Sequence, residues 1–92
     1  MKVLVVDVGG THVKILASGQ KERREFASGP TLTAKQMAFE VRKLAGDWSY
    51  DAVSIGYPGP VRRGRPVAEP HHLGHRWVGF DFEKAFGRPS RS

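Results

Sequence analysis

The sequence predicts one small α/β domain in which a mixed sheet packs against a single main helix. A near-continuous apolar run over residues 2–8 predicts a buried strand, and strict alternation over residues 12–18 predicts a second. Apolar residues at helical spacing follow over residues 33–45, and a further short strand pattern covers residues 51–56. A strand, a helix and a strand in this order predict a right-handed crossover into one sheet.

The N-terminal strands are expected to form an antiparallel meander. The apolar run of residues 2–8 is typical of a strand buried on both faces. Gly9-Gly10 then predicts a tight hairpin, because glycine accepts positive φ. In residues 12–18 the apolar residues fall on one side, and residues 22–27 predict a third, more exposed strand after a turn at residues 18–21.

The main helix has both a start and a stop signal. Thr33 is a good N-cap, and Gln36 three residues later completes a capping box. Gly46 is a natural C-terminal stop. One apolar face is expected from Met37, Val41, Leu44 and Ala45. Phe39 does not fit that face, which indicates a contact with a second surface.

The second half of the chain is more irregular. Residues 61–67 predict a small hairpin with Arg63-Gly64 at its tip, and residues 71–77 predict a loop. Asp81 is expected to cap a short helix over residues 82–86 that Gly87 ends. A buried strand should follow Pro89, but the sequence there is Ser-Arg-Ser, so we expect the chain to be interrupted before its last strand.

Composition limits the possible partners. The 92 residues carry 15 Lys+Arg against 9 Asp+Glu, a net charge of +6, which favours polyanions such as nucleotides, polyphosphate or nucleic acid. A solvated surface accounts for most of these dispersed charges. The absence of cysteine excludes disulfides and is compatible with a cytoplasmic location. No apolar run is long enough to span a bilayer.

The segment that points to chemistry is Asp7-Val8-Gly9-Gly10-Thr11-His12-Val13-Lys14. Glycines at a turn between strands let the backbone approach a ligand and direct N–H groups at it. Thr11 adds a hydroxyl, Lys14 adds a cation, and Asp7 could hold magnesium through water. An ordinary hairpin in which turn amides satisfy Asp7 is the alternative.

This segment and three later ones resemble, in order, segments of one protein family. Residues 7–14 resemble the phosphate motif D-x-G-G-T-x-x-K of the repressor–ORF–kinase (ROK) family of sugar kinases. Residues 55–61 are similar to that family's G-x-P-G-x-V segment, and residues 73–77 to its L-x-x-W segment. Residues 87–89 resemble the stretch before its next strand. The ordered set covers nearly the whole chain.

The resemblance implies the N-terminal lobe of the actin-like (hexokinase/Hsp70-type) ATPase fold, as a partial lobe over residues 1–92. A parent of this family transfers a phosphoryl group from ATP or polyphosphate, with Mg²⁺, to a hexose, here expected to be glucose, and is expected to be a homo-oligomer. The implied roles are metal binding by Asp7, phosphate binding by Gly9, Gly10, Thr11 and Lys14, and sugar binding by Gly56, Pro58 and Gly59.

The sequence departs from the family in one respect. The family's general base is an aspartate in an Asn-Asp-Ala segment expected after Pro89, and neither this segment nor the second lobe is found here. We therefore expect the chain alone to be inactive. Because the motif begins at Asp7, we also expect the kinase branch of the family, without a DNA-binding domain. The alternatives are a non-catalytic phosphate-binding module and, more remotely, a nucleic-acid binder.

Three weaker signals remain open. His71, His72 and His75 could form a metal site, although loop surface or a lining of the sugar cleft fits better because no cysteine joins them. The basic hairpin tip formed by Arg62, Arg63 and Arg65 could attract a polyphosphate donor or could simply be solvated. The aromatic residues are expected in the core rather than at a partner-binding face, namely Trp77, Phe80, Phe82 and Phe86.

Overall fold

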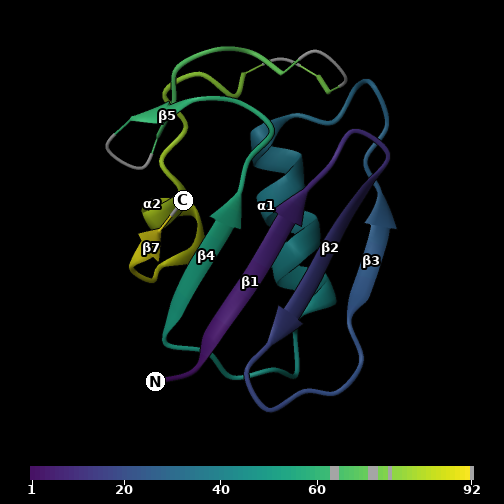
Figure 1. The fold of residues 1–92 in the computed structure, drawn as a ribbon, viewed down its shortest axis with the longest axis vertical. Helices are drawn as coiled ribbons and strands as arrows, with labels where there is room; N and C mark the ends of the chain where they lie inside the picture. Colours follow the sequence, from purple (N-terminus) through teal and green to yellow (C-terminus); the bar gives the residue numbers. More distant parts are fainter. Residues whose placement is uncertain (63–64, 71–72, 75, 92) are drawn as a thin grey trace.

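The structure is a computed structural model that describes residues 1–62, 65–70, 73–74 and 76–91. Up to α2, the strands and helices follow one another in the order that the sequence predicts (Figure 1). The elements are β1 Val3–Val8, β2 His12–Ala17, β3 Arg24–Ala27, α1 Ala34–Leu44, β4 Ala52–Gly56, β5 Val61–Arg62, β6 Arg65–Pro66, α2 Phe82–Phe86 and β7 Ser90–Arg91.

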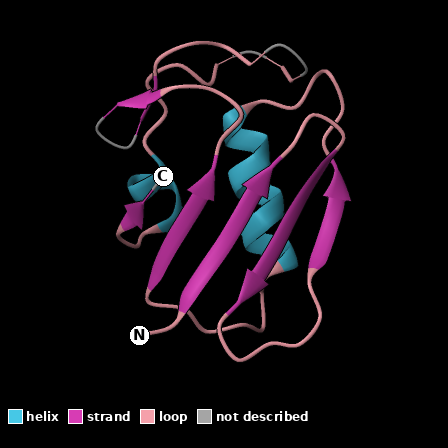
Figure 2. Ribbon diagram, viewed as in Figure 1, coloured by secondary structure: helices cyan, strands magenta, loops and turns pink. Residues whose placement is uncertain are grey.

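A five-stranded mixed sheet forms the centre of the fold, with the strand order β3-β2-β1-β4-β7. Strands β1, β2 and β3 pair antiparallel as a meander, whereas β4 pairs parallel with β1. Helix α1 connects β3 to β4 and crosses one face of the sheet (Figure 2). The predicted meander, crossover helix and parallel strand are therefore confirmed.

Strand β1 is buried on one face only, so the prediction of burial on both faces is wrong. Leu4, Val6 and Val8 are buried under α1, but Val5 between them is 49% exposed and Asp7 is exposed. Leu16, the β2 partner of Val5, is 39% exposed. Val5 and Leu16 are exposed because neither helix packs on this second face. The apolar run alone did not show that only one face would be covered.

The turn after β1 differs from the hairpin type that the Gly9-Gly10 pair predicts. The glycines with positive φ in the described part of the chain are Gly19, Gly29, Gly79 and Gly87. Residues 9–11 instead form a three-residue loop closed by a 2.9 Å hydrogen bond from the Gly9 amide to the His12 carbonyl. A Cβ on Gly9 would lie 2.9 Å from that same carbonyl oxygen. Glycine is required here for this tight closure and not for a left-handed φ.

Helix α1 begins at its predicted capping box. The Thr33 hydroxyl accepts the Gln36 amide at 3.2 Å, and the Gln36 side chain accepts the Thr33 amide at 3.0 Å. This reciprocal pair satisfies two of the amides that lack partners in a first helical turn. Met37 and Val41 are fully buried against the sheet, as their spacing predicts, whereas Phe39 is 63% exposed.

The four aromatic residues near the C-terminus belong to the core, which confirms the prediction. Trp77 and Phe82 are completely buried, Phe86 is 5% exposed, and Phe80 is partly buried against the same cluster. The Trp77 indole also donates a 3.0 Å hydrogen bond to the Leu32 carbonyl. The apolar body and the polar edge of this side chain are therefore both satisfied.

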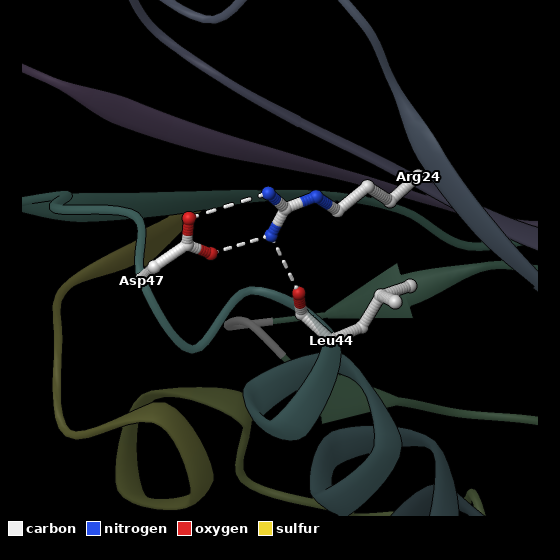
Figure 3. A network of polar contacts seen from close by, with 3 residues as sticks. All are labelled: Arg24, Leu44 and Asp47. Atoms are coloured by element: carbon white, nitrogen blue, oxygen red, sulfur yellow. Dashed lines mark hydrogen bonds and ion pairs between the residues drawn. The ribbon is translucent and has the colours of Figure 1, made fainter.

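Strand β3 is joined to the end of α1 by Arg24 (Figure 3). Its guanidinium donates to both carboxylate oxygens of Asp47, at 2.6 and 3.4 Å, and to the Leu44 carbonyl at 2.9 Å. It also lies 4.2 Å from the centre of the Trp48 ring. The hydrogen bond to Arg24 is the main cause that lowers the pKa of Asp47. One side chain thus closes the outer edge of the sheet onto the helix.

The prediction that the chain is interrupted before its last strand needs one correction, because a two-residue strand is already present at this point. Ser90–Arg91 form β7, which pairs parallel with β4 through Val53↔Ser90 and Ser54↔Arg91. The Val53 amide donates to the Pro89 carbonyl at 2.9 Å, and the Glu83 carboxylate accepts the Ser90 amide at 3.1 Å. Backbone pairing can begin without apolar side chains, so the polar composition of this segment did not prevent it.

The remaining elements agree with the sequence. Strands β5 and β6 form the predicted small hairpin, and Asp81 caps α2, which ends at Gly87 with φ 65°. The hairpin tip at Arg63-Gly64 lies outside the described residues, as do His71, His72 and His75. In the described part of the chain, no helix is long and apolar enough to cross a membrane.

Candidate functional site

The predicted phosphate motif lies at one edge of the sheet, where β1 and β4 both end. Because these strands are parallel, their carboxyl ends reach the same edge (Figure 1). The loop of residues 9–11 follows β1 there, and the segment from Tyr57 onward follows β4. The topology thus brings together two segments that lie about fifty residues apart in the sequence.

A row of three predicted site residues crosses adjacent strands at this edge. Asp7 on β1 is the register partner of Lys14 on β2 and of Gly56 on β4. Side chains on directly opposed residues of neighbouring strands project to the same face. Asp7 alternates with the buried Val6 and Val8, so this face is the open one. The carboxylate and the ammonium therefore project from the side of the sheet that no described helix covers.

Neither the Asp7 carboxylate nor the Lys14 ammonium has a partner among the described residues. No hydrogen bond or ion pair joins Asp7 to any described residue, and the same is true of the side chain of Lys14. Glu25 continues the row beyond Lys14 and forms no ion pair with it there. The interpretation that turn amides satisfy Asp7 therefore has no support in the described residues.

Gly56 leaves space beside the Asp7 carboxylate. A Cβ at position 56 would lie 3.3 Å from Asp7 Oδ1 and 3.7 Å from the Val6 carbonyl oxygen. Any larger residue would therefore crowd the carboxylate. An exposed, unpaired carboxylate oxygen is a suitable ligand for Mg²⁺ or for one of its waters. The residues present thus fit a magnesium ion at this position, with Asp7 as its protein contact.

Ser28 holds the loop of residues 9–11 through two hydrogen bonds, a role that no sequence signal indicated. Its hydroxyl donates to the Gly9 carbonyl at 2.8 Å, and its amide donates to the Thr11 carbonyl at 2.9 Å. Ser28 is also the buried polar residue of the described chain, at 8% exposure. With two carbonyls held inward, the backbone of this loop is fixed at both ends. The sequence showed only a Ser-Gly-Pro break at this point.

Thr11 and His12 are neighbours on the exposed rim of the loop. Thr11 Oγ1 lies 3.3 Å from His12 Nδ1, and both residues are exposed. His12 occupies an unspecified position of the phosphate motif, so nothing in that pattern drew attention to it. A hydroxyl and an imidazole at this rim can each donate a hydrogen bond to an anionic oxygen.

The predicted sugar-side residues follow β4 directly. Gly56 ends the strand, and Pro58 and Gly59 lie in the loop beyond it. A Cβ on Gly59 would lie 3.0 Å from the Tyr57 ring. The Tyr57 ring in turn packs at 5.5 Å from the Trp77 ring, and its hydroxyl donates to the Ala68 carbonyl at 2.9 Å. Tyr57 thus anchors this loop, a role that its sequence position did not indicate.

Burial, followed by the charge of Glu69, raises the pKa of Tyr57 to about 12. Glu69 also accepts hydrogen bonds from the amides of Trp77 and Val78, at 2.9 and 3.1 Å.

The segment around Gly74, which the family resemblance also includes, packs closely against residues 31–32. A Cβ on Gly74 would lie 2.5 Å from the Thr31 carbonyl oxygen. Three residues separate Leu73 from Trp77, one more than in the L-x-x-W pattern.

The described residues give little support to the histidine metal site or to a polyphosphate site at the basic hairpin tip. No group of three metal-binding side chains occurs among the residues that the structure describes, and the three clustered histidines lie outside them. Arg62 and Arg65 line a broad hollow of about 920 Å³ beside the small hairpin. Arg65 is already paired with Asp81 at 3.2 Å.

Comparison with known proteins identifies the fold. No family model matches the sequence, and no curated protein matches it. A ROK hexokinase from Thermus thermophilus superimposes with a TM-score of 0.73 at 25% identity, over 99% of this chain and 34% of that one. A ROK glucokinase from Streptomyces griseus, in complex with glucose and AMPPNP, gives 0.69 at 20% identity, over 98% and 32%. A Streptococcus pneumoniae ROK protein in complex with sucrose gives 0.72 at 17% identity, over 99% and 33%.

The structural neighbours of this chain are ROK sugar kinases. The resemblance that the motifs predict is therefore confirmed, and with it the α/β fold class of actin-like kinases. The chain spans about a third of the length of these ROK structures. Of the predicted site residues, the fold places Asp7, Lys14 and Gly56 in one row beside the loop of residues 9–11, with Pro58 and Gly59 in the segment that follows.

Proposed function

We propose that this chain is part of the N-terminal, phosphate-binding lobe of a ROK-type sugar kinase. The observation that carries the proposal is the row Asp7–Lys14–Gly56, unpaired and open beside the braced loop of residues 9–11. A free carboxylate, a free ammonium and a fixed backbone turn together suit a polyphosphate tail and its metal. The likeness to ROK hexokinases and glucokinases supports the same assignment.

In this proposal each residue has a distinct task. Asp7 holds a magnesium ion, which neutralises phosphate charge when it is bound. The backbone of Gly9, Gly10 and Thr11 contacts the phosphates, while Lys14 supports them with its charge. Gly56, Pro58 and Gly59 line the sugar side, where glucose is the expected hexose and ATP or polyphosphate the donor. The whole enzyme is expected to be a cytoplasmic homo-oligomer.

Calorimetric titration with ATP, with and without magnesium, tests the metal site. Magnesium should strengthen ATP binding to the wild-type chain, and Asp7→Asn should remove about a tenfold gain in affinity. Without magnesium the same change should not weaken binding, because it removes a negative charge that repels ATP. Glu22→Gln removes another exposed negative charge, at the β2–β3 turn, and serves as the control. An unchanged magnesium effect in Asp7→Asn would disprove the assignment.

We expect these 92 residues alone to transfer no phosphoryl group to sugar. They contain no Asn-Asp-Ala segment, and general-base assistance contributes roughly a hundred- to ten-thousandfold in rate. A coupled assay for glucose phosphorylation should therefore read the same with the chain as without protein. Turnover clearly above that blank would show that another group acts as the base.

A further inference from the structure

A groove of about 690 Å³ runs between α1 and α2, away from the proposed phosphate site. Helix α1 contributes one stripe of its surface, formed by Lys35, Phe39 and Arg42, which are four and three residues apart. The segment around α2 contributes Phe80 and Lys84. None of these residues has a place in the proposed kinase site.

The lining of the groove includes several apolar side chains, of which Phe39 is the most exposed. This ring is 63% exposed, the largest exposed apolar side chain on α1, although the rest of the helix follows a regular amphipathic pattern. Phe80, Ala38 and Ala85 extend the apolar surface and are themselves buried or partly buried against the core. An exposed aromatic ring next to further apolar side chains is the type of surface that accepts an anchoring side chain.

The rim of the groove carries positive charge that nothing in the described chain neutralises. Lys35, Arg42 and Lys84 are exposed, and their side chains form no ion pair with any described residue. The one carboxylate in the groove, Asp81, is already engaged. Its two oxygens accept the Lys84 amide, which caps α2, and the Arg65 guanidinium.

We propose that the α1–α2 groove docks an acidic segment of a partner protein that carries aromatic or aliphatic side chains at helical spacing. The apolar side chains of this segment would pack on Phe39, while its carboxylates pair with the cationic rim. A second copy of this chain is a poor occupant, because each copy carries a net charge of +6 and would bring further cations to the rim.

The test uses the 92-residue chain and a fluorescent synthetic peptide with leucine and phenylalanine at helical spacing among glutamates. Anisotropy should show saturable binding. Phe39→Ala should weaken it about tenfold, and Lys35→Glu with Arg42→Glu should weaken it at least as much. A matched pair, Lys21→Glu with Arg23→Glu, changes net charge equally at the β2–β3 turn and should have a smaller effect. Circular dichroism establishes that each variant is folded.

Three outcomes would overturn the proposal. One is the absence of saturable peptide binding. Another is an equal loss of binding in the Lys21/Arg23 pair, which would indicate nonspecific attraction to a basic protein. The third is binding of an acidic peptide that lacks apolar residues, or of single-stranded DNA, with the same dependence on Phe39. Because the groove shares no residue with the row at Asp7, this result and the ATP titration can fail independently.

Discussion

Tyr57 shows how much a single side chain contributes to the shape of the proposed cleft. Its ring lies against Gly59 and packs on Trp77, and its hydroxyl donates a hydrogen bond to the Ala68 carbonyl. In the sequence, Tyr57 stands out only as the residue before Pro58, since proline restricts the backbone of the residue before it. The tertiary contact became visible only when the fold brought Trp77 back over the end of β4.

The pH dependence of stability should report this contact. Burial, with the nearby Glu69 charge, raises the pKa of Tyr57 to about 12, compared with about 10 in an unfolded chain. The native state therefore holds the phenol proton more tightly. This contribution is complete below about pH 10 and is lost as pH rises through about 12.

Replacement of this tyrosine should isolate the effect. Tyr57→Phe should remove the high-pH component from the absorbance titration of tyrosinate and flatten the loss of stability between about pH 10 and 12. Tyr50 is the second of the two tyrosines, so Tyr50→Phe serves as the control. Persistence of the component near pH 12 in Tyr57→Phe would contradict the assignment.

At the scale of elements, the capping signals proved the most informative part of the sequence. The Thr33–Gln36 box and the Asp81 cap both form as predicted, because such caps depend on neighbours a few residues away. The burial of β1 was predicted wrongly and the two-residue strand at Ser90–Arg91 was not predicted, because each depends on which distant element lies alongside. The helix caps could be predicted from nearby residues, whereas the buried face of β1 could not.

The N-cap of α1 gives a prediction for stability. Thr33→Ala should lower the free energy of unfolding by about 1 kcal/mol, because the Gln36 amide loses its acceptor. For a domain of this size that corresponds to a fall of roughly 4–8 °C in Tm. Thr31→Ala is the matched control, since Thr31 is exposed and does not cap the helix. Equal effects of the two changes in thermal unfolding would show that the cap contributes nothing.

The candidate site was predictable as a set of residues but not as an arrangement. The motif identified Asp7 and Lys14 as chemically useful, and the family resemblance added Gly56. Only strand register shows that these three lie in one row. Ser28, which holds the Gly9–Thr11 backbone, carries no sequence signal beyond its place in a Ser-Gly-Pro turn.

At the scale of the whole molecule, the fold places two distinct charged surfaces on one small chain. One is the open sheet edge with a free carboxylate beside a free ammonium, and the other is the cationic groove between the helices. A protein with a net charge of +6 attracts any polyanion weakly, so affinity alone does not distinguish a built site from general attraction. The location of the bound polyanion distinguishes the two.

The most direct test is therefore a map of backbone amide resonances as magnesium and ATP are added to the 92-residue chain. We expect saturable shifts at residues 9–11, Lys14 and Gly56, with a marked dependence on magnesium. Shifts confined to the basic residues of the β2–β3 turn, or spread evenly over the surface without a magnesium effect, would contradict the central claim that this sheet edge is a phosphate-binding site.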